Sequence, residues 1–345
     1  SAVACIFLIN YLNALKKSPT IQSYFSNLKR QIIKVSPIIK NILGDVFENQ
    51  YKIDRQLGEG GFGKVFLAND TKTKNKVVIK SIPVKNDIMT ELFVKNEIQL
   101  LQRLSKLGCK YTCCYITHKY LDGNVYIVYT YDYDNTLASV IASSNKDIIP
   151  TIINNLLLGL KFLHNHNIAH GDIKPENIIV DIKTGDIKYI DFGISCNYSC
   201  YTERPGGTLL YSAPELLASK NKAKHNIALS LATVIARRSF TVPIKDIYRN
   251  DIWGLGVVIY MLLYKKHSYL PSLDINFYMK SENHYILPAL EAGTLPIHVE
   301  YDDQKVSVEY NNLLKKMLVI DPSKRSKIDE LLPSTSNSFF NFLGF

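Results

Sequence analysis

The chain has 345 residues, of which 46% are hydrophobic, and its formal net charge is +10; this composition is typical of a globular protein and excludes a disordered one. The first apolar run, "ACIFLI" at 4–9, is too short to span a bilayer and lacks a basic flank, so we expect no transmembrane segment and no signal peptide.

The positive charge is local, because residues 1–50 carry six Lys and Arg against two acids and residues 216–250 carry seven against one. We therefore expect no specific nucleic-acid binding; docking to acidic partners fits these two segments better, and solvated basic faces without a partner are the alternative.

The six cysteines, at 5, 109, 113, 114, 196 and 200, lack the paired C-x2-C spacing of a zinc site. We expect free thiols in a reducing compartment, and therefore an intracellular protein of the cytoplasm or the nucleus. The frequent Lys, Asn, Ile and Tyr suggest an AT-rich genome; if that genome belongs to a virus or a parasite, the compartment is in the host cell.

Residues 4–43 are predicted to form two or three helices. Ser18 is a candidate N-cap with Pro19 at the first helical position. Apolar residues then recur at helical spacing from Ile21 to Val35. This stripe is expected to pack on the adjoining domain, and a membrane-bound or partner-bound helix is the alternative.

From Tyr51 the pattern changes to strands. Two short strands flank a glycine-rich turn within 51–70, and a third strand covers 75–82. Residues 89–107 have the period of a helix, and 113–131 alternate like a hairpin around Asp122-Gly123, a strong two-residue turn signal. The pattern predicts a small antiparallel sheet with one helix.

After about residue 135 helices predominate. Residues 150–167 are predicted to be a helix, and 177–193 a second small hairpin that turns near Thr184-Gly185. Residues 251–264 are apolar nearly all round, which indicates a buried helix. Sheet first and helices afterwards indicate an α+β fold.

Gly58, Gly60 and Gly63 have the G-x-G-x-x-G spacing and lie between two predicted strands, followed by Val65. The glycine turn of a dinucleotide-binding fold leads instead from a strand into a helix, so the context argues against NAD. Glycines let backbone amides approach phosphates closely, so this hairpin can cover phosphate groups as a flap.

Lys80 lies near the end of the third predicted strand, seventeen residues after Gly63, where it can reach phosphate oxygens if an acid steadies it. Glu97 on the following helix is the best candidate for that acid, and Glu91 is the alternative. Taken alone, such a Lys–Glu pair is most often a surface salt bridge.

The stretch "HGDIKPEN" at 170–177 combines groups suited to phosphoryl transfer. Asp172 can orient and deprotonate a hydroxyl, and Lys174 can neutralise charge on the transferred group. Asn177 offers a hard oxygen ligand for Mg²⁺, and Asp191 in "DFG" offers a second one. Each residue alone is an ordinary loop polar group, but their joint order is highly specific.

With "SAPE" at 212–215, "DIWGLG" at 251–256 and "DPSKR" at 321–325, the chain resembles the eukaryotic protein kinases from about Tyr51 to Leu332. The resemblance implies a bilobal fold with a small antiparallel-sheet lobe and a mainly helical lobe, which bind ATP with Mg²⁺, or Mn²⁺ as an alternative, in the cleft between them. We expect an N-terminal helical extension at 1–47, the small lobe at 48–131, and the large lobe at 132–345 with an insertion at about 217–247.

The resemblance also implies roles for individual residues. Lys80 with Glu97 would position the α- and β-phosphates, Glu215 would pair with Arg325, and Asp251 would brace the loop around His170. The nucleotide would contact Leu57, Gly58, Gly60, Gly63, Val65, Val78, Lys80, Ile179, the gatekeeper Tyr129 and the hinge at Thr130-Tyr131.

Lys174 together with Thr208 in "GTLLYSAPE" resembles serine/threonine kinases rather than tyrosine kinases. Thr208 would bond near Asp172 and help to form a platform for protein substrates. An H-G-D sequence also occurs in small-molecule phosphotransferases, but these do not resemble the chain in the platform motifs. A pseudokinase scaffold is the other alternative, and the presence of every catalytic residue type argues against it.

Two features depart from the family pattern. Gly171 replaces the arginine that holds an activation-loop phosphate in many kinases, so we expect activity that is independent of such phosphorylation at Ser195, Ser199, Tyr201 or Thr202. Residues 217–247 form an unusually long insertion. With the N-terminal helices it is expected to dock a partner, a substrate or a second copy; the alternative is that it caps its own lobe.

Overall fold

The computed structural model describes two compact units of the chain, which are treated separately below. Residues from 50–91 and 116–131 belong to the first unit, and residues from 92–115 and 132–332 belong to the second. The described residues are 50–60, 63–84, 88–142, 147–197, 200–201, 208–216, 241–242, 244–270, 289 and 297–332. The predicted helices within 1–47 and most of the predicted insertion lie outside them.

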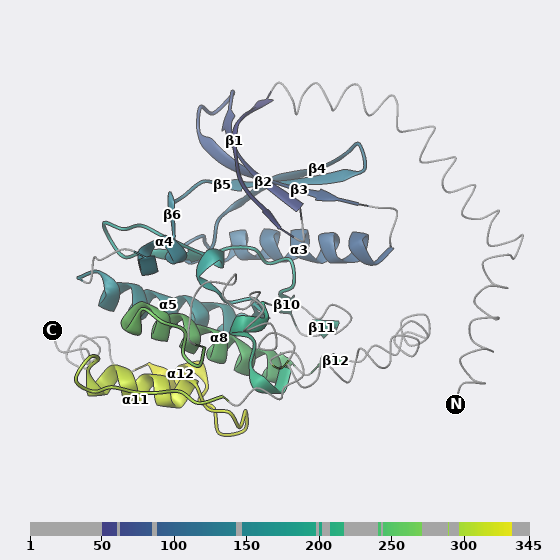
Figure 1. The fold of residues 1–345 in the computed structure, drawn as a ribbon. Coiled ribbons are helices and arrows are strands. Elements are labelled where there is room, and N and C mark those ends of the chain that lie inside the picture. Colours follow the sequence, from purple (N-terminus) through teal and green to yellow (C-terminus); the bar gives the residue numbers. More distant parts are fainter. Residues whose placement is uncertain are drawn as a thin grey trace, which may run out of the picture. The chain divides into compact units, whose positions relative to one another are not determined.

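The first unit is built on one five-stranded sheet (Figure 1) in the order β1-β2-β3-β5-β4. The pairs β1–β2, β2–β3 and β3–β5 are antiparallel, which confirms the small antiparallel sheet that the alternating pattern predicted. The strands are β1 (Tyr51–Gly60), β2 (Gly63–Asp70), β3 (Lys76–Pro83), β4 (Tyr115–Leu121) and β5 (Asn124–Thr130).

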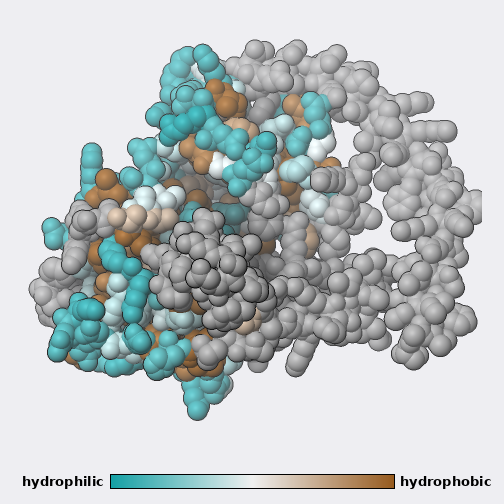
Figure 2. Space-filling view, viewed as in Figure 1, coloured by the Kyte–Doolittle hydropathy of each residue, from teal (hydrophilic) through white to brown (hydrophobic). Residues whose placement is uncertain are grey.

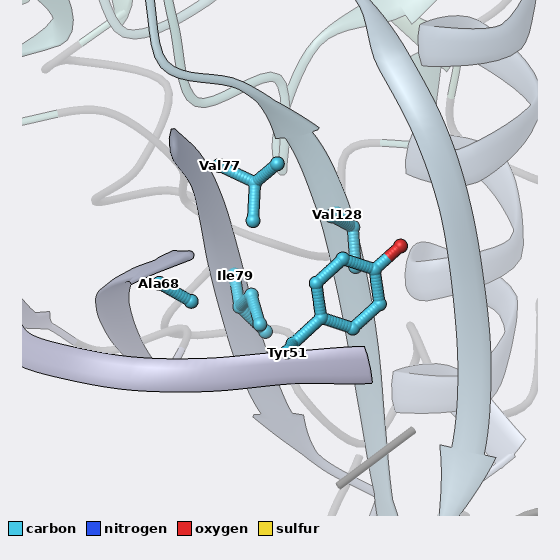
Figure 3. Close-up of a cluster of buried hydrophobic side chains, with 5 residues drawn as sticks. All are labelled: Tyr51, Ala68, Val77, Ile79 and Val128. Carbon is cyan, nitrogen blue, oxygen red and sulfur yellow. The ribbon is translucent and has the colours of Figure 1, made fainter. Parts of the chain in front are cut away.

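The two faces of this sheet carry different residues. One face carries a buried apolar cluster, and Figure 3 shows its five side chains. Successive strand residues point to opposite faces, so the register Val65↔Lys80↔Ile127 places Lys80 on the other face. The cluster comprises Tyr51, Ala68, Val77, Ile79 and Val128.

The turns of the sheet explain two sequence signals. Asp122 and Gly123 have φ values of 51° and 71°, the left-handed pair that a tight two-residue hairpin requires. Gly63 has a φ of 129°, and a Cβ at this position would overlap the Ser81 carbonyl, so only glycine fits there.

Helix α3 (Ile88–Lys106) begins in the first unit and ends in the second. Its bounds lie within one residue of the predicted 89–107. Val94, Ile98, Leu101 and Leu104 are buried at helical spacing, which is the period from which the helix was predicted.

The second unit is mainly helical (Figure 1). Its helices in the described part are α4 (Leu137–Ala142), α5 (Ile149–Asn165), α8 (Ile244–Tyr264), α11 (Val308–Met317) and α12 (Ile328–Leu331). Helix α5 contacts both α8 and α12, and α8 contacts α11. The predicted helix at 150–167 is therefore confirmed as α5.

Short strands and turns supply the rest of this unit. The sheet β6-β8-β9 contains the hairpin predicted near Thr184-Gly185, and Gly185 turns it with a φ of 77°. The strands are β6 (Asn135–Thr136), β7 (Ile168–Ala169), β8 (Ile178–Val180), β9 (Ile187–Tyr189), β10 (Cys196–Asn197), β11 (Cys200–Tyr201) and β12 (Thr241–Val242), and the 3-10 turns are η1 (Pro175–Asn177) and η2 (Leu209–Tyr211).

Helix α8 forms the core of the second unit. Trp253 and Tyr260 on this helix are fully buried, and so are their apolar neighbours on every side of it. The helix begins at Ile244, seven residues before the predicted start at Asp251. The polar stretch before Asp251 concealed this first part, because only the apolar residues carried the signal.

The bidentate ion pair predicted between Glu215 and Arg325 is present. Arg325 Nη1 lies 2.6 Å from Glu215 Oε1, and Arg325 Nη2 lies 3.0 Å from Glu215 Oε2. The guanidinium also donates to the Val319 and Arg249 carbonyls and lies over the Trp253 ring. Two segments 110 residues apart in sequence are thereby joined beside the core helix.

The expectation of free thiols is wrong for three cysteines. Cys109 and Cys114 form a disulfide with their Cα atoms 5.4 Å apart, because the loop after α3 folds back over four residues. Cys196 is also disulfide-bonded, whereas the buried Cys113 is free and burial raises its pKa well above the usual value. The argument for a reducing compartment therefore loses its basis.

The disulfide loop supports a neighbouring strand. Tyr111 O accepts a hydrogen bond from Tyr189 N at 2.8 Å, and Thr112 forms a parallel bridge with Tyr189. The loop thus extends the edge of β9, the strand that ends two residues before Asp191.

On the face drawn in Figure 2, apolar residues are interspersed with hydrophilic ones. Within the ranges that the structure describes, no helix has the length and apolar character needed to cross a membrane.

Candidate active site

The carboxylate of Asp172 is the centre of the candidate site in the second unit. It is 6% exposed, and each of its oxygens accepts hydrogen bonds. Oδ2 accepts from Lys174 Nζ at 2.7 Å and from Asn177 Nδ2 at 3.0 Å, while Oδ1 accepts from the Thr208 amide at 2.8 Å. These bonds fix the orientation of a carboxylate that is almost entirely removed from water.

The hydroxyl of Thr208 joins the two charged groups. It donates to Asp172 Oδ1 at 3.1 Å and accepts from Lys174 Nζ at 2.8 Å. The Lys174 ammonium group therefore lies beside Asp172 Oδ2 and the Thr208 hydroxyl oxygen. Only 22% of the Lys174 side chain is exposed. The sequence separation between Lys174 and Thr208 is 34 residues, so the fold rather than local geometry assembles this triangle.

Asn177 is oriented by the same carboxylate. Its Nδ2 donates to the Asp172 backbone carbonyl at 2.9 Å as well as to Asp172 Oδ2. Since the amide nitrogen takes both bonds, the side-chain Oδ1 is turned away from Asp172 as a hard oxygen donor.

The segment that carries Asp191, the other predicted metal ligand, is bonded to Asn177. Ile190 N donates to the Asn177 backbone carbonyl at 2.9 Å, so the residue before Asp191 is tied to Asn177. One amide oxygen and one carboxylate suit Mg²⁺, which commonly takes one or two protein oxygens and obtains its other ligands from phosphates and water. The described residues contain no group of three His, Cys, Asp or Glu that could hold a metal without such help.

The side chain of His170 stabilises the loop that carries Asp172. It is fully buried, its Nε2 lies 3.0 Å from the Ile190 carbonyl, and its Nδ1 accepts the Asp172 amide at 3.3 Å. These partners require the tautomer with the proton on Nε2. The ring also packs against Phe192, with centroids 5.0 Å apart, so His170 links the Asp172 loop to the segment around Asp191.

Asp251 at the start of the apolar part of α8 holds the backbone of this loop. Its side chain is fully buried and accepts the His170 amide and the Gly171 amide, each at 2.8 Å. His164 Nε2 lies 3.0 Å from the same carboxylate. The predicted bracing of the loop by Asp251 is therefore confirmed, and His164 is an additional partner.

Gly171 has a backbone that other residues rarely adopt. Its φ is 82°, and a Cβ there would lie 3.2 Å from the Ile194 carbonyl. The next residue of that segment, Ser195, donates its hydroxyl to the His170 carbonyl at 2.7 Å. Glycine at 171 therefore adopts this left-handed backbone without strain. Compared with the arginine expected at this position, it also lacks a cationic side chain.

The residues predicted to bind the nucleotide in the first unit share one face of the sheet. The registers Val65↔Lys80 and Val78↔Tyr129 place these four residues on the face opposite the Tyr51 cluster. Lys80 is 4% exposed. Leu57 is exposed and lies beside Gly58, at a register shift of β1.

The remaining predicted residues have the following places. Gly60 pairs with Gly63 at the end of the β1–β2 hairpin, and Tyr131 follows β5, with Lys76 Nζ 5.8 Å from its ring centroid. In the second unit, Ile179 lies in β8 between Thr136 and Lys188, and Glu97 is buried on α3. The pairing of Lys80 with Glu97 and the stacking of Ile179 on a nucleotide stay predictions.

The sequence interpretation missed His164 altogether and considered Ser195 only as a phosphate acceptor. Both make their contacts with residues far along the chain, at separations of 87 and 25 positions. No local spacing signals such contacts. The only clue for His164 was its position in the last turn of the helix that leads into the loop.

Comparison with known proteins identifies relatives of the chain. Residues 51–244 match the family model described as protein kinase domain. Serine/threonine-protein kinase max-2 of Caenorhabditis elegans is 26% identical over 82% of this chain and 38% of its own, and Serine/threonine-protein kinase fray1 of Dictyostelium discoideum is 28% identical over 92% and 51%. Calcium-dependent protein kinase 4 of Plasmodium falciparum is 29% identical over 81% and 48%. The chain spans about half the length of these relatives or less.

A substitution at Gly171 tests the left-handed backbone of the loop. We expect Gly171→Ala to lower the stability by about 1–2 kcal/mol, because an alanine is disfavoured at a φ of 82°. Chemical denaturation of both proteins measures the difference, and phosphoryl transfer should fall with it since Asp172 is the next residue.

Gly108→Ala is the matched control, because Gly108 has a φ of 93° but nothing within 4 Å of an added Cβ. It carries the backbone strain without the Ile194 contact and lies outside the loop. Equal transfer rates for Gly171→Ala and the unsubstituted chain would contradict the importance of this backbone conformation.

Proposed function

Since the chain belongs to the protein kinase family, we propose that it transfers the γ-phosphate of ATP to serine and threonine hydroxyls of protein substrates. The names of the matched relatives support this activity. The observation that carries the proposal is the triangle of Asp172, Lys174 and Thr208, with Lys174 Nζ 2.7 Å from the carboxylate and 2.8 Å from the threonine hydroxyl.

In this proposal Asp172 orients the attacking hydroxyl and receives its proton. The hydroxyl oxygen forms a bond to the γ-phosphorus, the bond from that phosphorus to the bridging oxygen breaks, and ADP leaves. Lys174 places a positive charge where negative charge develops on the transferred group. Most of the rate then comes from positioning and electrostatics, because the carboxylate and the ammonium group are already held in place.

The remaining residues bind the nucleotide in this proposal. Lys80, steadied by Glu97, positions the α- and β-phosphates, and backbone amides of the Gly58–Gly63 hairpin cover them. Asn177 and Asp191 hold Mg²⁺, with Mn²⁺ as an alternative; when bound, the ion neutralises charge on the phosphate oxygens. In the same proposal Leu57, Val65, Val78 and Ile179 sandwich the adenine, with Tyr129 as the gatekeeper and Thr130-Tyr131 as the hinge.

Replacement of Asp172 tests the chemistry. We expect Asp172→Asn to reduce phosphorylation of a peptide library by about 10²-fold or more, since the amide cannot take the proton. Nucleotide affinity, measured by calorimetry, should change little. Glu176→Gln is the matched control, because it removes one negative charge from an exposed position in the same loop.

The same assay separates the alternatives. ATP binding by the intact chain without transfer to any peptide would support a pseudokinase scaffold, and transfer to small alcohols alone would support a small-molecule phosphotransferase. Either result would overturn the proposed function.

Activation-loop phosphate is not required in this proposal, because Gly171 supplies no cation to bind it. Of the residues named above as phosphate acceptors, Ser199 and Thr202 lie outside the described residues. Ser195 differs from them, since its hydroxyl already donates to the His170 carbonyl. Replacing Ser195 would therefore remove a structural hydrogen bond whether or not the residue is ever phosphorylated.

Phosphatase treatment tests this independence without altering any side chain. We expect the dephosphorylated protein to keep its transfer rate within about twofold, because residue 171 has no cationic side chain to hold a phosphate. Intact mass measures the phosphate that remains. A rate that falls tenfold on dephosphorylation and returns on rephosphorylation would contradict the proposal.

The proposed function also includes docking through two segments that lie mostly outside the described residues. We propose that 1–47 and 217–247 bind a protein substrate, a partner or a second copy through their local positive charge. Deleting 219–240 leaves β12 and α8 intact and should reduce phosphorylation of whole proteins more than phosphorylation of short peptides. Equal losses for both, with a lower unfolding temperature, would favour a segment that caps its own lobe.

A further inference from the structure

We propose that His267 and Tyr269, in the loop after α8, are positioning residues for the acceptor peptide, because together they hold the backbone of Leu209–Tyr211 next to Thr208. This inference rests on the proposed kinase function. It concerns how the segment beside Asp172 is kept in shape rather than the transfer chemistry itself.

A single backbone carbonyl receives both side chains. His267 Nε2 lies 2.9 Å from Leu210 O, and the Tyr269 hydroxyl donates to the same oxygen at 3.0 Å. Leu210 and His267 are both buried. Two donors from one loop thus satisfy both lone pairs of a carbonyl 57 and 59 residues earlier in the chain.

The ring of His267 is set for this role. Its Nδ1 accepts the Tyr269 amide at 3.4 Å, so the proton is on Nε2 and points to Leu210. Burial lowers the pKa of His267 to about 4, and the neutral ring is therefore maintained near neutral pH. The rings of His267 and Tyr269 meet edge to face with centroids 4.6 Å apart, which stiffens both.

The anchored carbonyl belongs to a short, tightly bonded turn. Tyr211 N and the Ser212 hydroxyl both donate to the Thr208 carbonyl, at 2.9 and 3.2 Å, and Ala213 N donates to Asn250 Oδ1 at 2.9 Å. The segment is held at Thr208 by the catalytic loop and at Ala213 by α8. The Leu210 carbonyl is its middle anchor.

This arrangement separates two effects. Thr208 keeps its own bonds to Asp172 and Lys174, so loss of the middle anchor should leave the catalytic triangle in place. The backbone between Thr208 and Ala213 would loosen instead. We expect a peptide whose hydroxyl reaches Asp172 to lie along this backbone, because the segment starts at Thr208, which is bonded to Asp172. Binding of the peptide should then weaken while the chemical step is largely kept.

Tyr269→Phe removes one donor and keeps the ring against Trp253 and His267. We expect the KM for a peptide substrate to rise about three- to tenfold, the range that one buried hydrogen bond supports. The KM for ATP and kcat should stay within about twofold. His267→Leu should raise the peptide KM similarly, and His267→Gln, which can still donate to Leu210, should raise it less.

Tyr260→Phe is the matched control, because the Tyr260 hydroxyl also donates to a backbone carbonyl, that of Glu300, at 2.8 Å and lies on the neighbouring helix. It should not change the peptide KM. Thermal unfolding of each variant shows whether a change reflects stability alone.

The outcomes are distinct. Equal peptide KM values for Tyr269→Phe and Tyr260→Phe would overturn this inference and leave the proposed function standing. A lower kcat, higher KM values for both the peptide and ATP, and a lower unfolding temperature would together show a merely structural role. That result would overturn the inference as well. If the unsubstituted chain phosphorylates no peptide at all, the proposed function and this inference both fail.

Discussion

The catalytic loop depends on the hydrogen bonds that its backbone donates to the buried carboxylate of Asp251. A fully buried carboxylate is costly unless donors surround it, and here two consecutive backbone amides and one imidazole provide them. The requirement acts in both directions. The core helix can bury Asp251 only when the His170–Gly171 backbone is in place, and that backbone keeps its left-handed turn because the carboxylate holds it.

Two further buried polar links connect this centre to the rest of the second unit. Arg325 closes the core beside α8 through Glu215 and two backbone carbonyls, and His170 bonds the carbonyl that precedes Asp191. Each link joins segments that are distant in sequence. Polar groups of this kind give an apolar core a unique arrangement, because any other packing would leave them without partners.

The sequence predicted the parts of this structure that repeat with a regular period or form a known motif. The apolar spacing in α3 and α5 and the Asp122-Gly123 turn were enough to place these elements within one or two residues. The pairs Glu215–Arg325 and Asp251–His170 followed from the kinase resemblance. Residues such as His267 gave no signal, because their partner is a backbone carbonyl that carries no side-chain identity.

The disulfide was missed for a related reason. A spacing of four residues between Cys109 and Cys114 suits many loops, and only the path of the chain decides that the sulfurs meet.

The Cys109–Cys114 disulfide makes the structure of the chain next to β9 depend on the redox conditions. The loop contributes Tyr111 and Thr112 to the edge of β9, so the bond between two sulfurs constrains the strand that leads to the proposed metal ligand Asp191. Samples purified with a strong reductant and samples purified without one are therefore different molecules at this strand. Activities compared between laboratories are comparable only when the thiol content of each preparation is known.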